Sequence, residues 1–265
     1  MESIFEQLLY TTIRIECLDQ NKNAVSMGTG FILQRPVGDD KHKLYIVSNK
    51  HVLCGAKSIA ISFIRMKENE VEVRDHIPIT INDFEDIVVA HPDPDIDVAL
   101  FEWTNLIYMI PDRIIFKFVP YDILATFDEP ELTVAQNVYF VGYPDDRYDK
   151  KNNLPLIRSG MIASHPKYDY NGESAFIIDA QVFPGSSGSP VFIDLTFENF
   201  KNGRIDLGAK NIKLLGVVSS TMLRRNPLKI IETGKGFFTD EILGLGKVYK
   251  SIAIKELVDS MPIDN

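Results

Sequence analysis

The stretch Phe183-Pro-Gly-Ser-Ser-Gly-Ser-Pro190 decides the interpretation of this sequence, because it places a serine between two nearby glycines. Gly185 and Gly188 lack Cβ atoms, so the chain can turn sharply there and direct successive backbone N–H groups at one point. If Ser187 attacked a carbonyl group, the amides of Gly185 and Ser187 would be placed to bind the resulting oxyanion. Taken alone, such a Gly/Ser/Pro cluster is more often an ordinary turn, so other residues have to decide.

Two residues elsewhere in the chain have the chemistry that a serine nucleophile requires. A serine hydroxyl needs a base within hydrogen-bond reach, and the base needs a partner that fixes its tautomer. His51 follows an extended apolar run, and Asp97 lies among strand formers, where an unpaired carboxylate would be costly to bury. Alone, His51 could be a histidine at a strand end, and Asp97 a solvated acid or part of a calcium loop. Together with Ser187 they indicate a base, a carboxylate and a nucleophile.

Three motifs make the chain resemble the trypsin/chymotrypsin-like serine proteases, specifically the bacterial branch that includes the Deg-type proteases and glutamyl endopeptidases. The motifs are Ser48-Asn-Lys-His-Val52, Asp97-Val-Ala-Leu100 and Gly185-Ser-Ser-Gly-Ser-Pro190. Their order, and separations of 46 and 90 residues between His51, Asp97 and Ser187, are similar to those of the chymotrypsin triad. Subtilisins and α/β-hydrolases use other orders. The resemblance covers most of the chain, and we expect no PDZ domain.

The resemblance implies an all-β fold of two antiparallel six-stranded, chymotrypsin-like β-barrels with a C-terminal α-helix. Residues 1–117 would form the barrel that carries His51 and Asp97, and residues 118–265 the barrel that carries Ser187. The implied function is a serine endopeptidase that hydrolyses peptide bonds through an acyl-enzyme. The alternative, from a different class, is a catalytically silent or latent trypsin-fold protein that acts as a binding or sensor module.

The pattern of the chain agrees with a barrel architecture independently of the resemblance. Short alternating runs rich in β-branched residues, separated by turn residues, are typical of antiparallel barrels. Strands are predicted over residues 11–18, 28–35, 43–48, 57–64, 97–103, 136–142, 157–164, 175–182, 189–194 and 213–220. Only residues 251–259 have the spacing of an amphipathic helix.

The resemblance also implies which residues contact the substrate. Gln181 stands six residues before the nucleophile, at the base of the primary pocket, and its neutral side chain does not support a preference for Arg or Lys. A polar strand beside the pocket would pair with the substrate and favour a small or medium side chain. The residues assigned to substrate binding are Gln181, Ser219, Ser220 and Thr221, and Ser219 would also hold Asp97.

Regulation is the least defined part of the sequence. Ser186 stands where trypsin-type zymogens have the aspartate that captures a newly cut N-terminus, so activation by that salt bridge is not expected. Two long mixed stretches follow, between Asp194 and Leu214 and from Met222 to Leu243. Either these loops gate the substrate or bind a regulatory protein partner, or they are decorated surface hairpins.

The composition indicates a protein with one large core or two smaller ones, since the chain has 265 residues of which 45% are hydrophobic. Its net charge of −9 argues against nucleic acid as the main partner. No apolar run approaches the roughly 20 residues that span a bilayer, and the start is acidic, so we expect no membrane contact and a cytoplasmic location. The expected partner is a protein or peptide substrate. No metal and no cofactor is implied.

Cysteine usage is consistent with that location. The two cysteines, Cys17 and Cys54, contrast with the several bridges usual in secreted members of the family. A disulfide between them stays open, but two reduced thiols in the core are the preferred interpretation. Neither cysteine has a neighbour at metal-ligand spacing.

Overall fold

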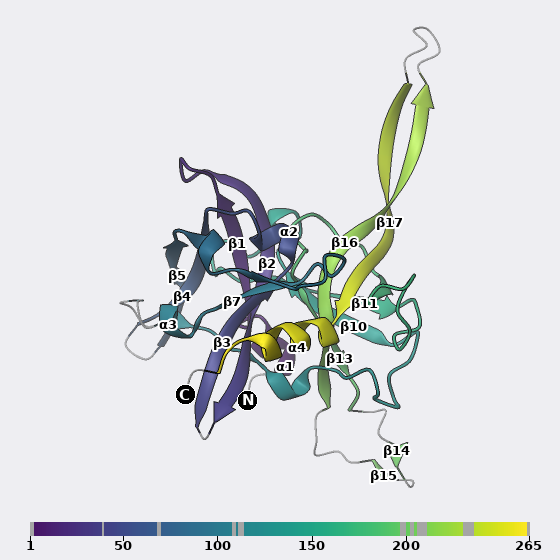
Figure 1. Cartoon of the computed structure of the whole chain (residues 1–265), viewed down its shortest axis with the longest axis horizontal. Coiled ribbons are helices and arrows are strands. Elements are labelled where there is room, and N and C mark those ends of the chain that lie inside the picture. The colour runs from purple at the N-terminus through teal and green to yellow at the C-terminus, as the bar shows by residue number, and fades with distance from the viewer. Residues whose placement is uncertain are drawn as a thin grey trace.

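The computed structural model describes residues 3–38, 40–67, 70–107, 110, 114–196, 200–201, 204–205, 211–229 and 236–263. Two β modules lie side by side, and a C-terminal helix packs at their junction (Figure 1). The predicted all-β, chymotrypsin-like class with a C-terminal helix is confirmed.

The N-terminal module is a nine-stranded sheet with the strand order β5-β4-β1-β2-β3-β7-β6, to which β8 adds on β4 and β9 on β2. The β2–β9 pair is parallel, whereas β2 pairs antiparallel with β1 and β3. In the described part of the module β5 and β6 each pair on one side only, so they are the two ends of this strand order. The strands are β1 (Thr12–Leu18), β2 (Ala24–Gly38), β3 (Lys41–Ser48), β4 (Ser58–Lys67), β5 (Glu70–Ile81), β6 (Val89–Ala90), β7 (Ala99–Glu102), β8 (Ile114–Ile115) and β9 (Val119–Pro120).

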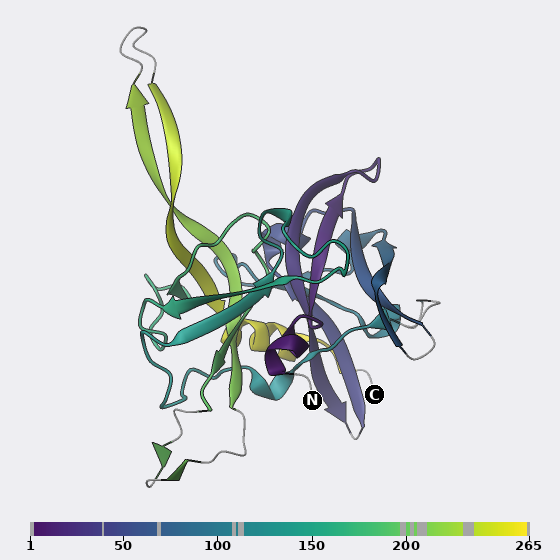
Figure 2. The ribbon, with the colours of Figure 1, turned by 180° about the vertical axis from the view of Figure 1, so that it is seen from behind.

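The C-terminal module is a closed barrel with the strand order β10-β11-β12-β17-β16-β13. Strands β16 and β17 extend beyond the barrel as a long hairpin that projects from the body of the molecule (Figures 1 and 2). A separate two-stranded sheet pairs β14 with β15. The strands are β10 (Asn137–Gly142), β11 (Leu156–Ile162), β12 (Ala175–Asp179), β13 (Pro190–Asp194), β14 (Phe200–Lys201), β15 (Arg204–Ile205), β16 (Ile212–Lys229) and β17 (Gly236–Lys250).

Helices are short and lie between or after the strands. Helix α1 begins with a capping box in which the Ser3 and Glu6 side chains bond to each other's backbone amides. Within the described ranges, no helix is both long and apolar enough to cross a bilayer. The α-helices are α1 (Ile4–Leu8), α2 (Lys50–Leu53), α3 (Thr104–Ile107) and α4 (Ser251–Ser260), and the 3₁₀ helices are η1 (Phe84–Asp86), η2 (Tyr121–Ile123) and η3 (Pro144–Asp146).

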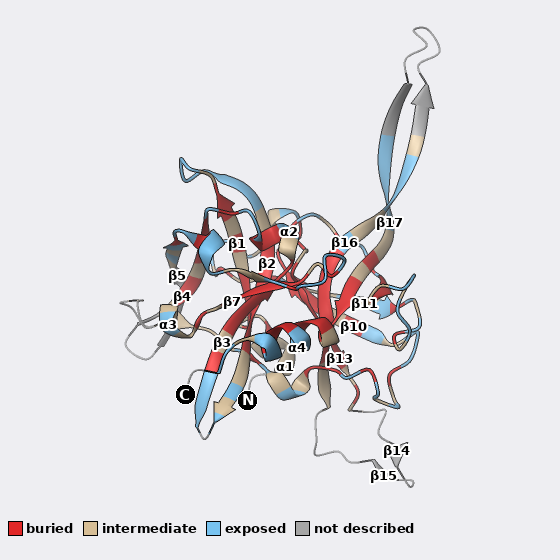
Figure 3. Cartoon of the chain, viewed as in Figure 1, coloured by how far each residue is buried: buried red, intermediate tan, exposed pale blue. Residues whose placement is uncertain are grey.

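Buried apolar side chains form one cluster inside each module and a third cluster between them (Figure 3). The third cluster joins Leu33 and Val47 of the N-terminal sheet to Phe192 and Val217 of the barrel. Leu257 of α4 belongs to the same cluster, because the helix turns its apolar face toward this junction. The two modules are therefore held together by a shared core.

Each of the ten predicted strands coincides with an observed strand, and the predicted helix coincides with α4. The ends differ by a few residues except in β16, which was predicted to end at residue 220 and continues to Lys229. Asp97 lies just before β7, which begins at Ala99, so its carboxylate is at the strand's end and not within the strand. Strands β5 and β17 were not predicted as strands, nor were the two-residue strands β6, β8, β9, β14 and β15.

In the long stretch from Met222 to Leu243, residues 222–229 and 236–243 belong to the projecting strands, with Leu223 opposite Ile242 and Arg224 opposite Glu241, and residues 230–235 lie outside the described residues. Strand pairing is compatible with either alternative, so a role of this stretch toward the substrate or a partner stays a prediction. The other long stretch, between β13 and β16, contains β14 and β15, and its residues 197–199, 202–203 and 206–210 lie outside the described residues.

Both cysteines are free thiols. Cys17 is buried in the core of the N-terminal sheet, as predicted. The prediction was wrong for Cys54, which is exposed. Cys54 is the C-terminal cap of the single-turn helix α2, where the chain leaves the sheet, so its side chain does not reach the core.

Candidate active site

The turn around Ser187 needs both of its glycines. Gly185 has φ +85° and Gly188 has φ +89°, which L side chains rarely adopt. A Cβ at Gly188 would lie 1.8 Å from the carbonyl oxygen of Thr29, and one at Gly185 would lie 2.5 Å from that of Tyr143. The turn is therefore pressed against β2 of the other module and against the end of β10.

Two backbone amides of this turn have no acceptor. Among the hydrogen bonds of the described residues, the N–H groups of Gly185 and Ser187 donate to nothing, whereas Ser186 N–H donates to Phe183 C=O at 3.0 Å. Unpaired amides beside a nucleophile are the groups that stabilise an oxyanion. The two amides are the ones that the sequence assigned to this role.

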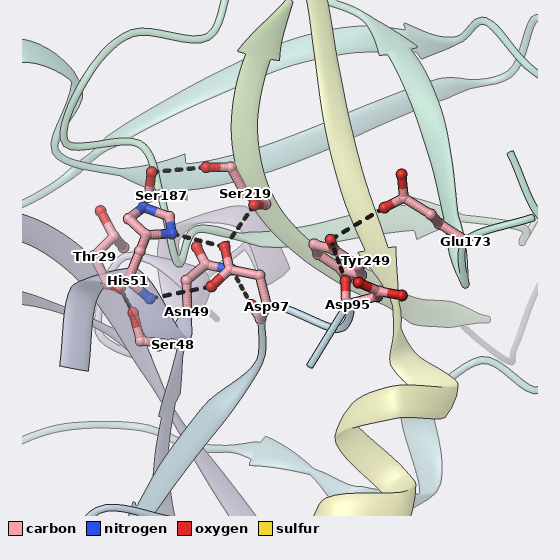
Figure 4. A network of polar contacts seen from close by, with 10 residues as sticks. All are labelled: Thr29, Ser48, Asn49, His51, Asp95, Asp97, Glu173, Ser187, Ser219 and Tyr249. Carbon is pink, nitrogen blue, oxygen red and sulfur yellow. Dashed lines mark hydrogen bonds and ion pairs between the residues drawn. The ribbon is translucent and has the colours of Figure 1, made fainter. Parts of the chain in front are cut away.

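His51 and Asp97 form a direct pair. The Nδ1 atom of His51 lies 2.7 Å from Asp97 Oδ2, and the backbone N–H of His51 donates to Asp97 Oδ1 at 3.1 Å (Figure 4). Because a carboxylate accepts, Nδ1 carries the proton and the Nε2 lone pair is left free to accept one. The His51 side chain is 51% exposed and that of Asp97 22%, so the imidazole is open to solvent while the carboxylate is largely covered.

Two further contacts hold Asp97 in place. Ser219 Oγ donates to Asp97 Oδ2 at 2.7 Å, and the Asn49 side chain donates to the Asp97 carbonyl at 2.7 Å. Burial raises the pKa of Asp97, but the hydrogen bonds from His51 and Ser219 outweigh it, and the net pKa lies below the ordinary value. Asp97 is therefore held as a carboxylate.

Ser187 is joined to this group through Ser219. Its Oγ donates to the Ser219 carbonyl at 2.8 Å, and Figure 4 shows the hydroxyl beside the edge of the His51 ring that carries Nε2. Among the described residues no hydrogen bond joins Ser187 Oγ to His51. For the Ser187 hydroxyl to donate to the His51 imidazole in place of the Ser219 carbonyl, the side chain must rotate about its Cα–Cβ bond.

The predicted substrate-binding residues are only partly gathered. Ser219 is buried within the site, and Ser220 and Thr221 continue along β16, where Ser220 is exposed. Gln181 is exposed, and no hydrogen bond of the described residues joins it to Ser187 or to β16. His51 also lines an open pocket of about 340 Å³, together with Val25, Val52 and Cys54.

Sequence reasoning missed the buried polar residues behind the turn. Thr29 and Ser48 are completely buried, and Ser48 Oγ donates to the Thr29 carbonyl at 2.6 Å. The sequence placed Asn49 in the histidine motif but did not predict its hydrogen bond to the Asp97 carbonyl. The Gly28-Thr-Gly30 segment was the available signal, since small residues there indicate close approach of another backbone. Among the described residues no cluster of His, Cys, Asp and Glu could hold a metal ion.

The closed barrel, the second sheet and a site at their junction define the class of chymotrypsin-like double-barrel proteins. A family model for the trypsin-like peptidase domain matches residues 28–197, which include His51, Asp97 and Ser187. The chain belongs to this family.

Comparison with solved structures agrees with the fold. The active form of the Rv3671c protease from M. tuberculosis is 19% identical, with 99% of this chain and 85% of that chain covered and a TM-score of 0.50. The protein HBP is 8% identical, with 97% and 93% covered and a TM-score of 0.54. At such identities the likeness concerns the fold alone. No curated protein matches the sequence.

Proposed function

We propose that the protein is a serine endopeptidase in which Ser187 is the nucleophile, His51 the general base and Asp97 its partner. The observation that carries the proposal is the His51 ring, fixed by Asp97 at 2.7 Å, beside a serine whose turn keeps two amides unpaired. Membership of the trypsin-like peptidase family supports the same reaction class.

The chemistry follows from the tautomer and the two amides. Ser187 Oγ attacks the carbonyl carbon of a peptide bond while His51 Nε2 takes the hydroxyl proton. The carbonyl oxygen becomes an oxyanion and accepts hydrogen bonds from the amides of Gly185 and Ser187. His51 then gives its proton to the leaving amine, which departs as the new N-terminus, and an acyl-enzyme remains. Water, activated by the same imidazole, hydrolyses the ester and restores Ser187.

The proposed substrate is a polypeptide that lies extended along β16 from Ser219 onward. One edge of β16 pairs with β13. Beyond Val218 this edge has no strand partner among the described residues, so its backbone groups can pair with a substrate strand. We propose that Ser219, Ser220 and Thr221 contact this strand and that Gln181 lies toward the primary side chain. A small or medium side chain would suit these neutral groups.

A second candidate is a latent form of the same enzyme or a silent binding module. It is favoured by one observation, the bond from Ser187 Oγ to the Ser219 carbonyl in place of His51. Breaking that bond and turning the hydroxyl would then be the step that a substrate or a regulatory protein partner promotes. Hydrogen bonds of active sites without substrate are commonly incomplete, so the endopeptidase stays the first proposal.

Covalent labelling distinguishes the two candidates. Purified protein would be treated with a fluorophosphonate probe and measured by intact mass beside the Ser187→Ala and His51→Ala variants. We expect one adduct on the wild type, none on Ser187→Ala, and labelling of His51→Ala slower by on the order of 10⁴-fold or more. Folded wild-type protein that takes up no probe would contradict a constitutively active enzyme and favour the latent or silent form.

A further inference from the structure

The Thr29 side chain bridges the two modules directly behind the turn of Ser187. Thr29 lies on β2 of the N-terminal sheet and is completely buried. Its Oγ1 accepts from the backbone N–H of Tyr143 at 3.2 Å and donates to the carbonyl of Gly185 at 2.8 Å. A hydroxyl has one proton, and because Tyr143 N–H is itself a donor, that proton is directed to Gly185.

The bond from Thr29 to the Gly185 carbonyl matters because the turn leaves the backbone amides of Gly185 and Ser187 unpaired. In a trans peptide unit the C=O and the following N–H point in opposite directions, so holding a carbonyl aims the next amide. The Pro184 carbonyl accepts from Asp145 N–H at 2.6 Å, which aims the amide of Gly185. The Ser186 carbonyl accepts from Ser189 N–H at 3.0 Å, which aims the amide of Ser187.

The peptide unit between these two, from Gly185 to Ser186, is held at its N–H by the Phe183 carbonyl at 3.0 Å and at its carbonyl by Thr29 Oγ1. Gly185 is the residue most able to rotate, since it has no Cβ and already sits at φ +85°. A rotation of this unit would change the angle between the two aimed amides. The hydroxyl of Thr29 is the side-chain donor that resists it.

We propose that Thr29 is a positioning residue for the oxyanion site, acting through Gly185, and that it makes this site depend on docking of the two modules. The inference rests on the proposed function, because the amides have this role only if Ser187 attacks a carbonyl. The Thr29 hydroxyl that holds the Gly185 carbonyl comes from β2, whereas the two unpaired amides belong to the C-terminal module. Contact between the modules therefore supplies the bond that fixes the Gly185 carbonyl, in addition to the bonds within the turn itself.

The side chain can be tested apart from the backbone of Thr29. Thr29 N–H donates to the Ser187 carbonyl at 2.8 Å, and the Thr29 carbonyl accepts from Ser48 Oγ at 2.6 Å. Neither bond uses Oγ1, so both should survive replacement of the hydroxyl by a methyl group. Thr29→Val keeps the shape and the branching of the side chain, and Thr29→Ser keeps the hydroxyl.

A matched control is Thr11→Val. Thr11 is 3% exposed, and its Oγ1 donates to the Leu8 carbonyl at 2.9 Å, away from the turn. This variant also loses a buried threonine hydroxyl bonded to a backbone carbonyl, so it reports the general effect of such a loss.

The experiment measures the rate of fluorophosphonate labelling as a function of pH, together with crystal structures of the wild type and Thr29→Val. We expect Thr29→Val to react about 10- to 100-fold more slowly, since misplacing an oxyanion donor should cost somewhat less than removing one. Thr29→Ser should stay within about threefold of the wild type, and Thr11→Val should not change. The shape of the pH profile should be retained, because the His51–Asp97 pair is untouched. In the crystal, the Gly185 carbonyl of Thr29→Val should turn from its wild-type direction.

Unchanged labelling of Thr29→Val, or equal losses in Thr29→Val and Thr11→Val, would overturn the proposal. Should Thr29→Val not fold, Thr29→Ala takes its place against the same controls. If the wild type takes up no probe, the proposed function fails, and the crystal structures test the role of Thr29 separately. A Gly185 carbonyl that keeps its wild-type direction in Thr29→Val would show that the Thr29 hydroxyl does not hold it.

Discussion

Asp97 is the residue whose protonation should be most visible in the stability of the protein. Its carboxylate accepts from the ring and the backbone of His51 and from Ser219, and these bonds set its pKa below the ordinary value of 3.8 although burial raises it. A carboxyl group with a lowered folded-state pKa stabilises the fold above its unfolded pKa, and this contribution is lost as the pH falls through the folded pKa.

We therefore predict that Asp97→Asn lowers the free energy of unfolding by about 1.5–3 kcal/mol at pH 7, the range for hydrogen bonds to a charged group. The difference from the wild type should shrink as the pH falls below the unfolded pKa of 3.8, where the folded carboxylate also becomes protonated. Urea unfolding at a series of pH values measures it. Asp95→Asn is the control, since Asp95 belongs to the same loop and is exposed. A difference that grows on acidification would contradict the assignment.

At this scale the sequence located the candidate residues but not their contacts. Motif and order pointed to His51, Asp97 and Ser187, because each chemical role permits few residue types. The acceptor of the Ser187 hydroxyl could not be predicted, since a serine has three rotamers and its neighbours choose among them. The role of Thr29 could not be predicted either, because its partners Tyr143 and Gly185 lie 114 and 156 residues away in the sequence.

Helix α4 is the element whose packing connects the chain's end to both modules. Leu257 is 1% exposed and lies in the cluster that the two modules share. We predict that Leu257→Ala lowers the free energy of unfolding by about 2–5 kcal/mol, as expected for a buried leucine whose site cannot collapse. Ile263→Ala, at a side chain that is 51% exposed, should change it by less than about 0.5 kcal/mol. Chemical denaturation of both variants checks this, and equal effects would show that α4 does not anchor the junction.

The two long strands that were not predicted, β5 and β17, were missed for the same physical reason. Strand β5 is at the end of its sheet and pairs only with β4, and residues 76–81 alternate between exposed and partly buried positions until Ile81. Such an edge strand needs no continuous apolar run. In the outer part of β17, cross-strand contacts such as Arg225 Nε with Asp240 Oδ1 at 3.2 Å hold the hairpin in place of burial. Hydrophobic periodicity detects strands that face a core along their length, whereas the described side chains of β5 and β17 reach a core only near one end, at Ile81 and at Val248 and Tyr249.

The whole molecule is organised around the shared cluster. Its members include Phe31 and Leu100 from the N-terminal sheet and Leu214 and Tyr249 from the barrel. An ion pair between Arg14 of β1 and Asp146, at 2.8 Å, crosses the same junction. Separation of the modules would expose this apolar surface to water, which costs about 25 cal/mol for each Å². Neither module should therefore be stable in the folded state without the other.

We predict that the chain unfolds in one cooperative transition. Trp103 is the single tryptophan, is completely buried and lies in the cluster inside the N-terminal sheet, so its fluorescence reports that module alone. Far-ultraviolet circular dichroism reports the strands of both modules. If the shared cluster couples them, the two signals should have the same urea midpoint and the same slope. A circular dichroism curve with two steps, only one of which coincides with the fluorescence, would show instead that the modules unfold independently. Loss of labelling at Ser187 should then follow the earlier step, because His51 and Ser187 belong to different modules and the site needs both.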